Sequence, residues 1–292
     1  MEKIKFSLIL CTLGREREVF EFVESLKKNK CKSYELIIVD QNKNSRLSEI
    51  SNILNDVRVV YKKVDFCGLS KARNFGLSFC IGNIIAFPDD DCIYQNYLLD
   101  RMINVINKFD YDFYSINTKD MQSGRSLISH NLSCSEEISI LNRRFVSFTL
   151  FFKKHLIDDV GGFDERMGVG ADSPFGAGEE SDYVVRALKK GYHGLFLDYL
   201  YAYHLVKSNM NTPLYKRQYL YGGGYAYFLY KHQDCFGKRY LLLRSLGVLL
   251  SIIKRPYPLT KLRNSLCFSL GYYNVFIKAI LGIYGISKND IR

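Results

Sequence analysis

Residues 83–91 are NIIAFPDDD, an apolar run that ends in a proline and three adjacent aspartates. A short apolar run between polar residues is typical of a buried strand. Similar runs occur before and after it, and they alternate with amphipathic helical patterns. This alternation predicts the α/β class, with a mostly parallel, doubly wound sheet flanked by helices. We expect strands at 6–11, 34–39, 58–62, 83–87, 112–117, 145–152 and 194–197, and helices at 16–28, 69–80, 98–109 and 179–190.

The charge of the chain is unevenly distributed. Of the 41 Lys and Arg residues, 14 lie in residues 205–292, where the only acids are two Asp. That segment therefore carries a net charge of +12, whereas residues 1–204 carry −1. From about residue 215 the pattern is helical and rich in aromatic residues. We therefore expect an α/β domain at 1–204 and a basic helical C-terminal appendage at 205–292.

The composition is that of a globular protein, because 47% of the 292 residues are hydrophobic; a disordered chain is thereby excluded. The eight Cys form no C-x-x-C pair, so we expect reduced thiols and a cytoplasmic protein. The first residues have neither the apolar length nor the cleavage site of a signal peptide. No uninterrupted run reaches the ~18–20 apolar residues that a spanning helix needs.

The three adjacent aspartates, Asp89, Asp90 and Asp91, are the sharpest chemical signal. Neighbouring carboxylates repel one another unless a cation or strong hydrogen-bond donors neutralise them. In extended backbone residues i and i+2 point the same way, so Asp89 and Asp91 can act together. Mg²⁺ and Mn²⁺ prefer oxygen ligands and often bridge carboxylates to a diphosphate. A solvated turn or a helix cap is the alternative.

Two further segments are candidates for nucleotide binding. Asp40 ends the apolar run LIIVD, so it is expected at the same rim of the sheet as the aspartates, where ligands of parallel sheets bind. It would accept a hydrogen bond from a base or ribose, or it would only close the strand with a turn. Residues 68–76, GLSKARNFG, open a helix; there Arg73 is an anion-binding or a merely solvated side chain.

Acidic residues also open the helix expected at 179–190. Glu179 and Glu180 are favoured there by the helix dipole alone. Alternatively, one of them removes the proton from an attacking hydroxyl as a general base. His204, in YAYHLVKSN, is either a structural histidine or a ligand.

Several common motifs are absent from the sequence. No G-x-G-x-x-G follows the first strand, so a nicotinamide or flavin site is unsupported. The chain also has no G-x-x-x-x-G-K-[ST] phosphate loop and no G-x-S-x-G nucleophile turn, which argues against a P-loop enzyme and an α/β hydrolase.

Taken in order, these segments resemble glycosyltransferase family 2, the inverting enzymes with the GT-A fold, over about residues 6–203. The matching pieces are Thr12 and Arg15 after the first strand, Asp40, 68–76, FPDDD at 87–91, GGFDE at 161–165 and GEESD at 178–182. The resemblance implies metal-dependent sugar transfer from a nucleotide-sugar donor, expected to be a UDP-sugar. The acceptor is expected to be a glycan or lipid-linked glycan in surface polysaccharide synthesis.

The resemblance also implies which residues bind the donor. Thr12 and Asp40 would line the nucleoside pocket, together with Arg15, and Asp40 would hold the base. Arg73 would lie near the nucleotide, and Asn74 would support it. In the first motif Thr-Leu-Gly-Arg stands where the family commonly has Thr-Tyr-Asn-Arg, which leaves the identity of the base open.

The remaining roles concern the metal and the base. Asp91 would be the nearer ligand of Mn²⁺ or Mg²⁺, Asp89 would face ribose and metal, and Asp90 would be the less critical middle residue. His204 matches a histidine that contacts metal or diphosphate. Glu180 falls where the family has its catalytic Asp, so we expect Glu180 as the base, with Glu179 as the alternative.

The basic tail and the net charge of +11 leave other functions to compare. Residues 215–292 could lie on the inner face of the cell membrane, cap the catalytic domain or form a homodimer. A nucleic-acid-binding protein would need its cations along one groove, but here they are interspersed with Leu and Ile, so we expect no nucleic-acid partner. A sugar-nucleotide pyrophosphorylase would need a glycine-rich phosphate loop after the first strand, where 12–17 supply one Gly.

Overall fold

The structure is a computed structural model that describes residues 5–127, 135–204, 214–251 and 259–284. The described chain forms two compact units. The first, here the sheet unit, comprises 5–67, 71–127, 135–162 and 186–204. The second, here the helical unit, comprises 68–70, 163–185, 214–251 and 259–284. These units are not the two contiguous segments expected from the sequence, because 163–185 group with the C-terminal helices.

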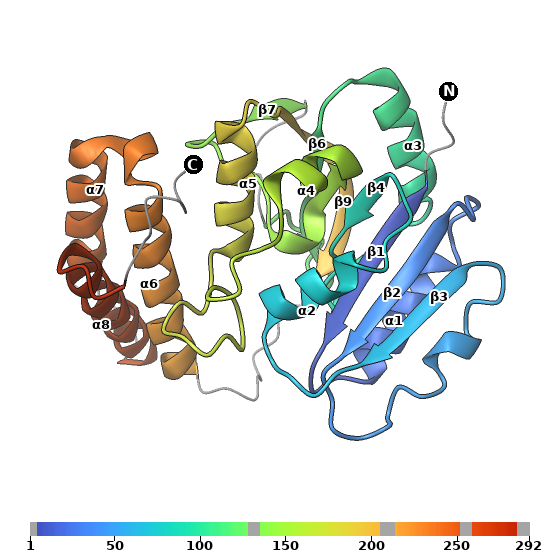
Figure 1. The fold of residues 1–292 in the computed structure, drawn as a ribbon, viewed down its shortest axis with the longest axis horizontal. Coiled ribbons are helices and arrows are strands. Elements are labelled where there is room, and N and C mark those ends of the chain that lie inside the picture. The colour runs from blue at the N-terminus through green and yellow to red at the C-terminus, as the bar shows by residue number, and fades with distance from the viewer. Residues whose placement is uncertain (1–4, 128–134, 205–213, 252–258, 285–292) are drawn as a thin grey trace. The chain divides into compact units, whose positions relative to one another are not determined.

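The sheet combines a parallel half with a mixed half (Figure 1). Its strand order is β3-β2-β1-β4-β8-β6-β9-β5, and β7 pairs with β9. The first four strands are parallel throughout, whereas β8 runs antiparallel to both β4 and β6. The α/β fold class is thereby confirmed. The strands are β1 (Phe6–Thr12), β2 (Tyr34–Asp40), β3 (Arg58–Lys63), β4 (Ile84–Ala86), β5 (Cys92–Tyr94), β6 (Phe113–Asp120), β7 (Glu136–Ile138), β8 (Leu150–Lys153) and β9 (Gly194–His204).

Helices cover both faces of the parallel half. Alternate residues of a strand face opposite sides, so Leu8 and Leu10 of β1 pack with Phe22 of α1, whereas Ile9 faces Gly76 of α2. A Cβ on Gly76 would lie 2.5 Å from the Ile9 side chain, which explains a glycine inside this helix. The helices are α1 (Arg17–Leu26), α2 (Leu69–Leu77), α3 (Leu98–Lys108), α4 (Lys154–Val160), α5 (Glu179–Lys189), α6 (Leu214–Lys231), α7 (Gln233–Leu250) and α8 (Leu259–Ile280).

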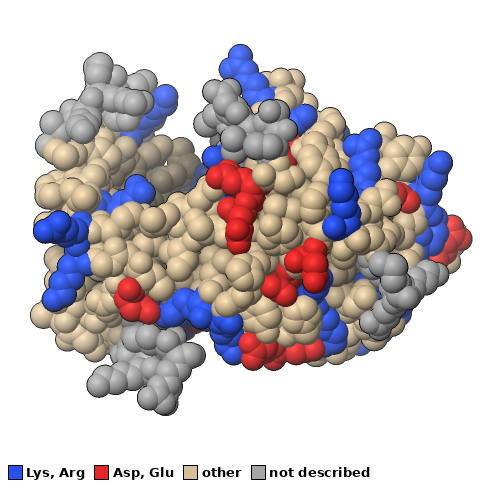
Figure 2. Space-filling view, turned by 90° about the horizontal axis from the view of Figure 1, so that it is seen from above, with Lys and Arg blue, Asp and Glu red and all other residues tan. Residues whose placement is uncertain are grey.

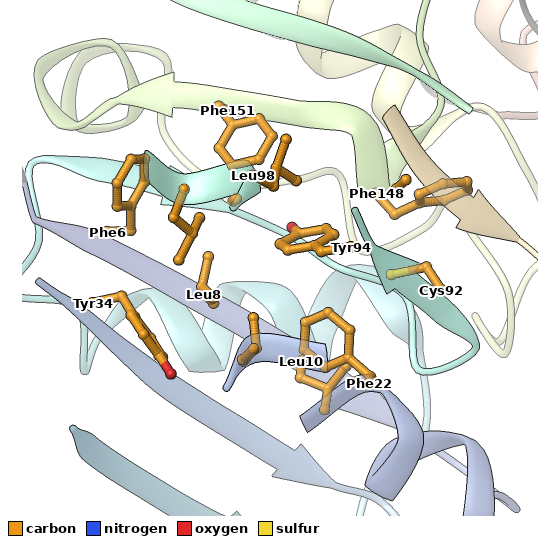
Figure 3. Close-up of a cluster of buried hydrophobic side chains, with 14 of the residues drawn as sticks. Phe6, Leu8, Leu10, Phe22, Tyr34, Cys92, Tyr94, Leu98, Phe148 and Phe151 are labelled. Atoms are coloured by element: carbon orange, nitrogen blue, oxygen red, sulfur yellow. The ribbon is translucent and has the colours of Figure 1, made fainter. Parts of the chain in front are cut away.

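The core of the sheet unit is formed by the sheet with α1 and α3 and is rich in aromatic rings (Figure 3). Phe22 meets Tyr94 edge to face at 5.3 Å, and Phe6 meets Phe151 at 6.3 Å. Aromatic pairs in this geometry add stabilisation beyond the area that they bury. This core fixes the strand ends that carry the candidate site.

Two expected strands differ from those observed. The strand expected at 145–152 begins only at Leu150, because 147–149 form a 3-10 turn in which Thr149 Oγ1 donates to the Val146 carbonyl at 2.8 Å. The strand expected at 194–197 extends to His204. A bulge, at which Asp198 accepts a 2.6 Å hydrogen bond from Asn117, interrupts its apolar pattern. A polar bulge of this kind breaks the residue pattern from which the length of a strand is predicted.

The helical unit is built on close contact between α6 and α8. Added Cβ atoms on Gly222 and Gly271 would lie 2.0 and 1.9 Å from carbonyl oxygens of the facing helix. The glycine-rich stretch before α5 packs on α6, since Phe175 stacks on Tyr227 at 4.0 Å and Gly176 donates to the Leu220 carbonyl at 3.1 Å. These contacts explain why 163–185 belong to this unit.

Substituting Gly271 by alanine is expected to lower the free energy of unfolding by about 1–3 kcal/mol, because the methyl group forces α6 and α8 apart. Gly247 on α7 is the matched control: a Cβ there meets nothing within 4 Å, so Gly247→Ala is expected to stabilise by ~0.5–1 kcal/mol. Urea unfolding of both variants measures the contrast. Equal changes in the free energy of unfolding would show that the close contact between α6 and α8 at Gly271 does not contribute to stability.

None of the helices in the described parts of the chain is long and apolar enough to cross a membrane. The seven described cysteines are all free thiols; Cys134 lies outside the described residues.

Candidate active site

The strand ends of the parallel half place the predicted nucleotide-binding residues at one rim. Thr12 and Asp40 are paired in register at the ends of β1 and β2. Cys11 forms an isolated parallel bridge with Asp89, so the three aspartates after β4 lie beside the end of β1. The expectation that Asp40 and the aspartates share a rim is confirmed.

Asp90 points toward the first loop of the sheet unit. It accepts hydrogen bonds from Thr12 Oγ1 at 2.7 Å and from Arg15 Nη1 at 2.5 Å. Burial raises the pKa of Asp90 to about 6, although the charge of Arg15 and the Thr12 hydrogen bond act in the opposite direction. Asp90 therefore holds the side chains of Thr12 and Arg15 at the rim by hydrogen bonds.

Asp89, Asp91 and His204 form a group that can hold a metal ion. Their ligand atoms lie within 4.8 Å of one another. The antiparallel pairing of β5 with β9 sets Cys92 opposite His204 and so brings the histidine to Asp91, with His204 Nε2 at 3.1 Å from Asp91 Oδ1. Phe148 stacks on the imidazole at 5.2 Å and fixes its plane. Two carboxylates and an imidazole suit a divalent cation.

The charges around Asp91 keep it ionised. Burial pushes its pKa up, but the hydrogen bond and charge of His204 and of Arg15 outweigh burial and lower the pKa to about 2. In turn, burial lowers the pKa of His204, and Asp91 more than compensates, so that the His204 pKa is raised. Arg15 Nη1 also lies 2.5 Å from Asp91 Oδ2, so one guanidinium contacts two of the three aspartates.

Asp89 faces a second arginine. Arg73 of α2 is 1% exposed, and its Nη2 lies 3.4 Å from Asp89 Oδ1. Asn74, the next residue, packs against Gly162, where an added Cβ would lie 2.8 Å from Asn74 Oδ1. The buried guanidinium is therefore held beside the rim.

Asp40 is fully buried and organises its neighbours. One oxygen accepts from the backbone N–H and the side-chain amide of Asn42 at 2.8 and 2.6 Å, and the other accepts from the Tyr61 hydroxyl at 2.6 Å. Asn42 Oδ1 in turn accepts from the Gly14 N–H at 2.6 Å. Sequence reasoning missed Asn42 and Tyr61. The sequence signal that could have found Asn42 is its position two residues after Asp40, a spacing that favours an Asx turn.

Glu179 and Glu180 lie in the first turn of α5, in the helical unit, and differ in exposure. Glu179 is 5% exposed, and its carboxyl group packs against Gly168, where an added Cβ would lie 3.2 Å from Glu179 Cδ. Glu180 is partly exposed. Of the two carboxylates, that of Glu180 is therefore the more accessible to solvent.

A buried ionic network lies directly after these glutamates. Asp182 is fully buried. Its carboxylate forms an ion pair with Lys231 Nζ at 2.8 Å and a hydrogen bond with His232 Nε2 at 2.9 Å. Lys231 also bonds Asp164 Oδ2 of the GGFDE segment at 2.9 Å. One buried cation thus joins α5, the glycine-rich stretch and α6. The sequence signal for Asp164 was its place in GGFDE, whereas nothing marked Lys231 or His232.

Comparison with known proteins identifies the class. A model of Glycosyl transferase family 2 matches residues 7–162, more than half of the chain. The chain belongs to glycosyltransferase family 2, as the sequence motifs indicated.

Solved structures show the same GT-A fold. S. aureus TarS aligns with a TM-score of 0.61 and 18% identity, over 98% of this chain and 46% of TarS. Residues 1–349 of S. aureus TarS in complex with UDP-GlcNAc align with a TM-score of 0.60 and 19% identity, over 96% of this chain and 92% of that one.

Among curated proteins, the similarity covers part of each chain. The Escherichia coli UDP-Glc:alpha-D-GlcNAc-diphosphoundecaprenol beta-1,3-glucosyltransferase WfaP is 26% identical over 148 residues, 45% of this chain and 59% of WfaP. An uncharacterized glycosyltransferase of Rickettsia felis is 27% identical over 110 residues, 37% of this chain and 18% of that protein. The chain thus matches less than a fifth of the Rickettsia protein.

Proposed function

We propose that the protein transfers a sugar from a nucleotide diphosphate donor to an acceptor hydroxyl with inversion of configuration, in a metal-dependent reaction. The observation that carries this proposal is the convergence of Asp89, Asp91 and His204 within 4.8 Å at the rim that also holds Thr12 and Asp40. Family membership supports sugar transfer as the reaction, in preference to the pyrophosphorylase and nucleic-acid alternatives.

We assign the donor as a UDP-sugar and the acceptor as a glycan or lipid-linked glycan of a surface polysaccharide. Structures of the similar TarS contain UDP-GlcNAc and UDP, and the similar WfaP is named for a UDP-Glc donor and a diphosphoundecaprenol-linked acceptor. Asp40, with Asn42, would shape the nucleoside pocket, and Arg15 and Arg73 would face the diphosphate.

The residues at the rim fit Mn²⁺ or Mg²⁺. Asp91 is ionised at neutral pH because its pKa is about 2, and it shares the site with a second carboxylate and an imidazole. A structure of the similar mannosyltransferase PcManGT from Pyrobaculum calidifontis contains GDP-Man and Mn²⁺; it aligns with a TM-score of 0.59 and 11% identity, over 98% of this chain and 77% of that one. A bound cation would offset the charge that develops on the leaving diphosphate.

The chain's own groups supply the remaining chemistry. In a single displacement, the acceptor oxygen forms a bond to the anomeric carbon while the bond from that carbon to the diphosphate oxygen breaks. We assign Glu180 to accept the hydroxyl proton during this step. Arg15 and Arg73, with the cation, would stabilise the electron pair that leaves with the diphosphate.

Asp91→Asn tests the metal site. We expect Mn²⁺ affinity to fall by at least ~10²-fold, since even the loss of an outer-shell partner costs 10–100-fold, and donor hydrolysis to fall with it. Titration calorimetry with Mn²⁺ and a panel of nucleotide sugars measures both. Asp110→Asn, at a carboxylate that is 97% exposed, is the control and should bind like wild type. Wild-type protein that neither binds Mn²⁺ nor hydrolyses any donor would refute the proposal.

A further inference from the structure

Helix α7 carries a stripe of exposed leucines. Leu242 and Leu243 are 61% and 67% exposed, and Leu246, Leu249 and Leu250 are 45%, 46% and 40% exposed. Their spacings of three and four residues put all five on one face of the helix. Single exposed leucines are common on protein surfaces, whereas a contiguous row of five marks an interaction surface.

The opposite face of α7 makes the contacts that hold it in the helical unit. The Ser245 and Tyr272 hydroxyls lie 2.8 Å apart, and Tyr273 donates to the Ser245 carbonyl at 2.5 Å. Val248 is 9% exposed, and its carbonyl accepts from Ser269 Oγ at 3.2 Å. The helix therefore packs on α8 with one face and leaves the leucine face outside the core.

Helix α8 repeats the arrangement on a smaller scale. Leu266, Leu270 and Ile277 are 39%, 63% and 53% exposed, and Leu281, just after the helix, is 68% exposed. The spacings of four, seven and four residues keep them on one helical face. Both of the last two helices thus expose apolar rows, whereas Ser245 of α7 and Tyr272 of α8 are buried in their contact.

Positive charge accompanies the apolar rows. Residues 214–284 contain eleven Lys and Arg but a single acid, Asp234. On α7, Lys238, Arg239 and Arg244 are exposed beside the leucines. In the space-filling view, blue Lys and Arg groups stand among tan surface (Figure 2). The surface is therefore apolar and cationic at once.

We propose that the leucine stripe of α7 binds the surface of an anionic phospholipid bilayer, with the helix lying in the plane of the interface. An interfacial helix buries its apolar face among the acyl chains while its Lys and Arg side chains reach the headgroups. Anionic lipids attract each of the neighbouring cations. The α8 row provides a second apolar contact of the same kind.

Charge favours a lipid surface over a second copy of the chain. Two copies that met through α7 would bring Lys238, Arg239 and Arg244 of each toward the same three cations of the other, with only Asp234 as an acid on that helix. Like charges at an interface oppose association. An anionic bilayer supplies the missing opposite charge.

Flotation of the full chain with vesicles tests the inference. We expect wild-type protein to float with phosphatidylglycerol–phosphatidylcholine vesicles and much less with phosphatidylcholine alone. Leu242→Gln/Leu246→Gln is expected to lower the partition coefficient by ~10-fold or more, because two apolar anchors are lost. Lys238→Gln/Arg239→Gln/Arg244→Gln is expected to abolish the preference for anionic vesicles, and high salt to weaken it.

The control is Ile81→Gln/Leu141→Gln in the sheet unit, at side chains that are 57% and 70% exposed; it should float like wild type. Circular dichroism shows that each variant is folded. Wild-type protein that stays with the unbound fraction overturns the inference. So does sedimentation showing a wild-type dimer that the leucine variant converts to monomer without any vesicle binding. Because flotation needs no donor, its outcome is independent of the proposed transfer reaction, and donor hydrolysis without vesicles should be unchanged in the leucine variant.

Discussion

Replacing Glu180 by glutamine is expected to slow sugar transfer by about 10²–10⁴-fold, the usual cost of removing a general base. Glutamine keeps the shape of the side chain but cannot accept the acceptor's proton. Donor binding should be unchanged, since in our proposal Glu180 acts on the acceptor. Steady-state kinetics with donor and acceptor, together with calorimetric donor binding, separate the two quantities.

Glu179→Gln is the matched control for this experiment. Glu179 is 5% exposed and packs against Gly168, so we expect its substitution to affect folding stability more than the chemical step. If Glu179→Gln lost activity while Glu180→Gln kept it, the base would be Glu179. If both variants kept full activity, neither glutamate would be the base.

Replacing Lys231 by methionine is expected to lower the free energy of unfolding by about 3–5 kcal/mol, because one partner of a buried ionic network is removed. Lys231 is 5% exposed and lies 2.9 and 2.8 Å from carboxylates of Asp164 and Asp182. In the variant the carboxylates of Asp164 and Asp182 stay buried but lose the positive charge that Lys231 supplies. Urea unfolding at neutral pH measures the loss. Lys238→Met, on exposed α7, should change stability little.

The pH dependence of unfolding tests whether Lys231→Met loses stability because a charge is removed. Burial pushes the pKa of Asp164 up, but the Arg166 hydrogen bond and the Lys231 charge outweigh it and lower the pKa to about 2. A lowered pKa stabilises the fold fully above the ordinary value near 4, and this contribution disappears as the pH falls toward 2. The gap between wild type and Lys231→Met should therefore narrow in acid. A gap independent of pH would mean that packing, not charge, was lost.

Much of the fold could be predicted from the sequence because its strands are apolar on both faces. The runs that became β1, β2 and β4 are fully buried, so their sequences are nearly continuous apolar runs, broken near the start of β1 and β2 by Ser7 and Glu35. Short elements were missed. β5 and β7 have three residues each, too few for any period, and α4 was overlooked within the stretch after β8.

The candidate site was predictable in part, for a related reason. Asp40 and the three aspartates directly follow strands, so the rule for parallel sheets places them together. The position of His204 depends on pairing between β5 and β9, which are far apart in sequence and antiparallel, and no local pattern reveals such a pairing. The resemblance to a family supplied that residue. The Lys231 network likewise joins segments 49 and 67 residues apart in the chain, as Lys231 meets Asp182 and Asp164.

The guanidinium of Arg15 affects whether the protein needs a metal ion to fold. It contacts both Asp90 and Asp91, and Arg73 lies beside Asp89, so each aspartate already has a cationic neighbour within the polypeptide. Folding then needs no metal ion to relieve carboxylate repulsion. Chelator-treated protein should keep its thermal transition, and a cation arriving with the donor would have to share Asp91 with an arginine that already occupies one of its oxygens.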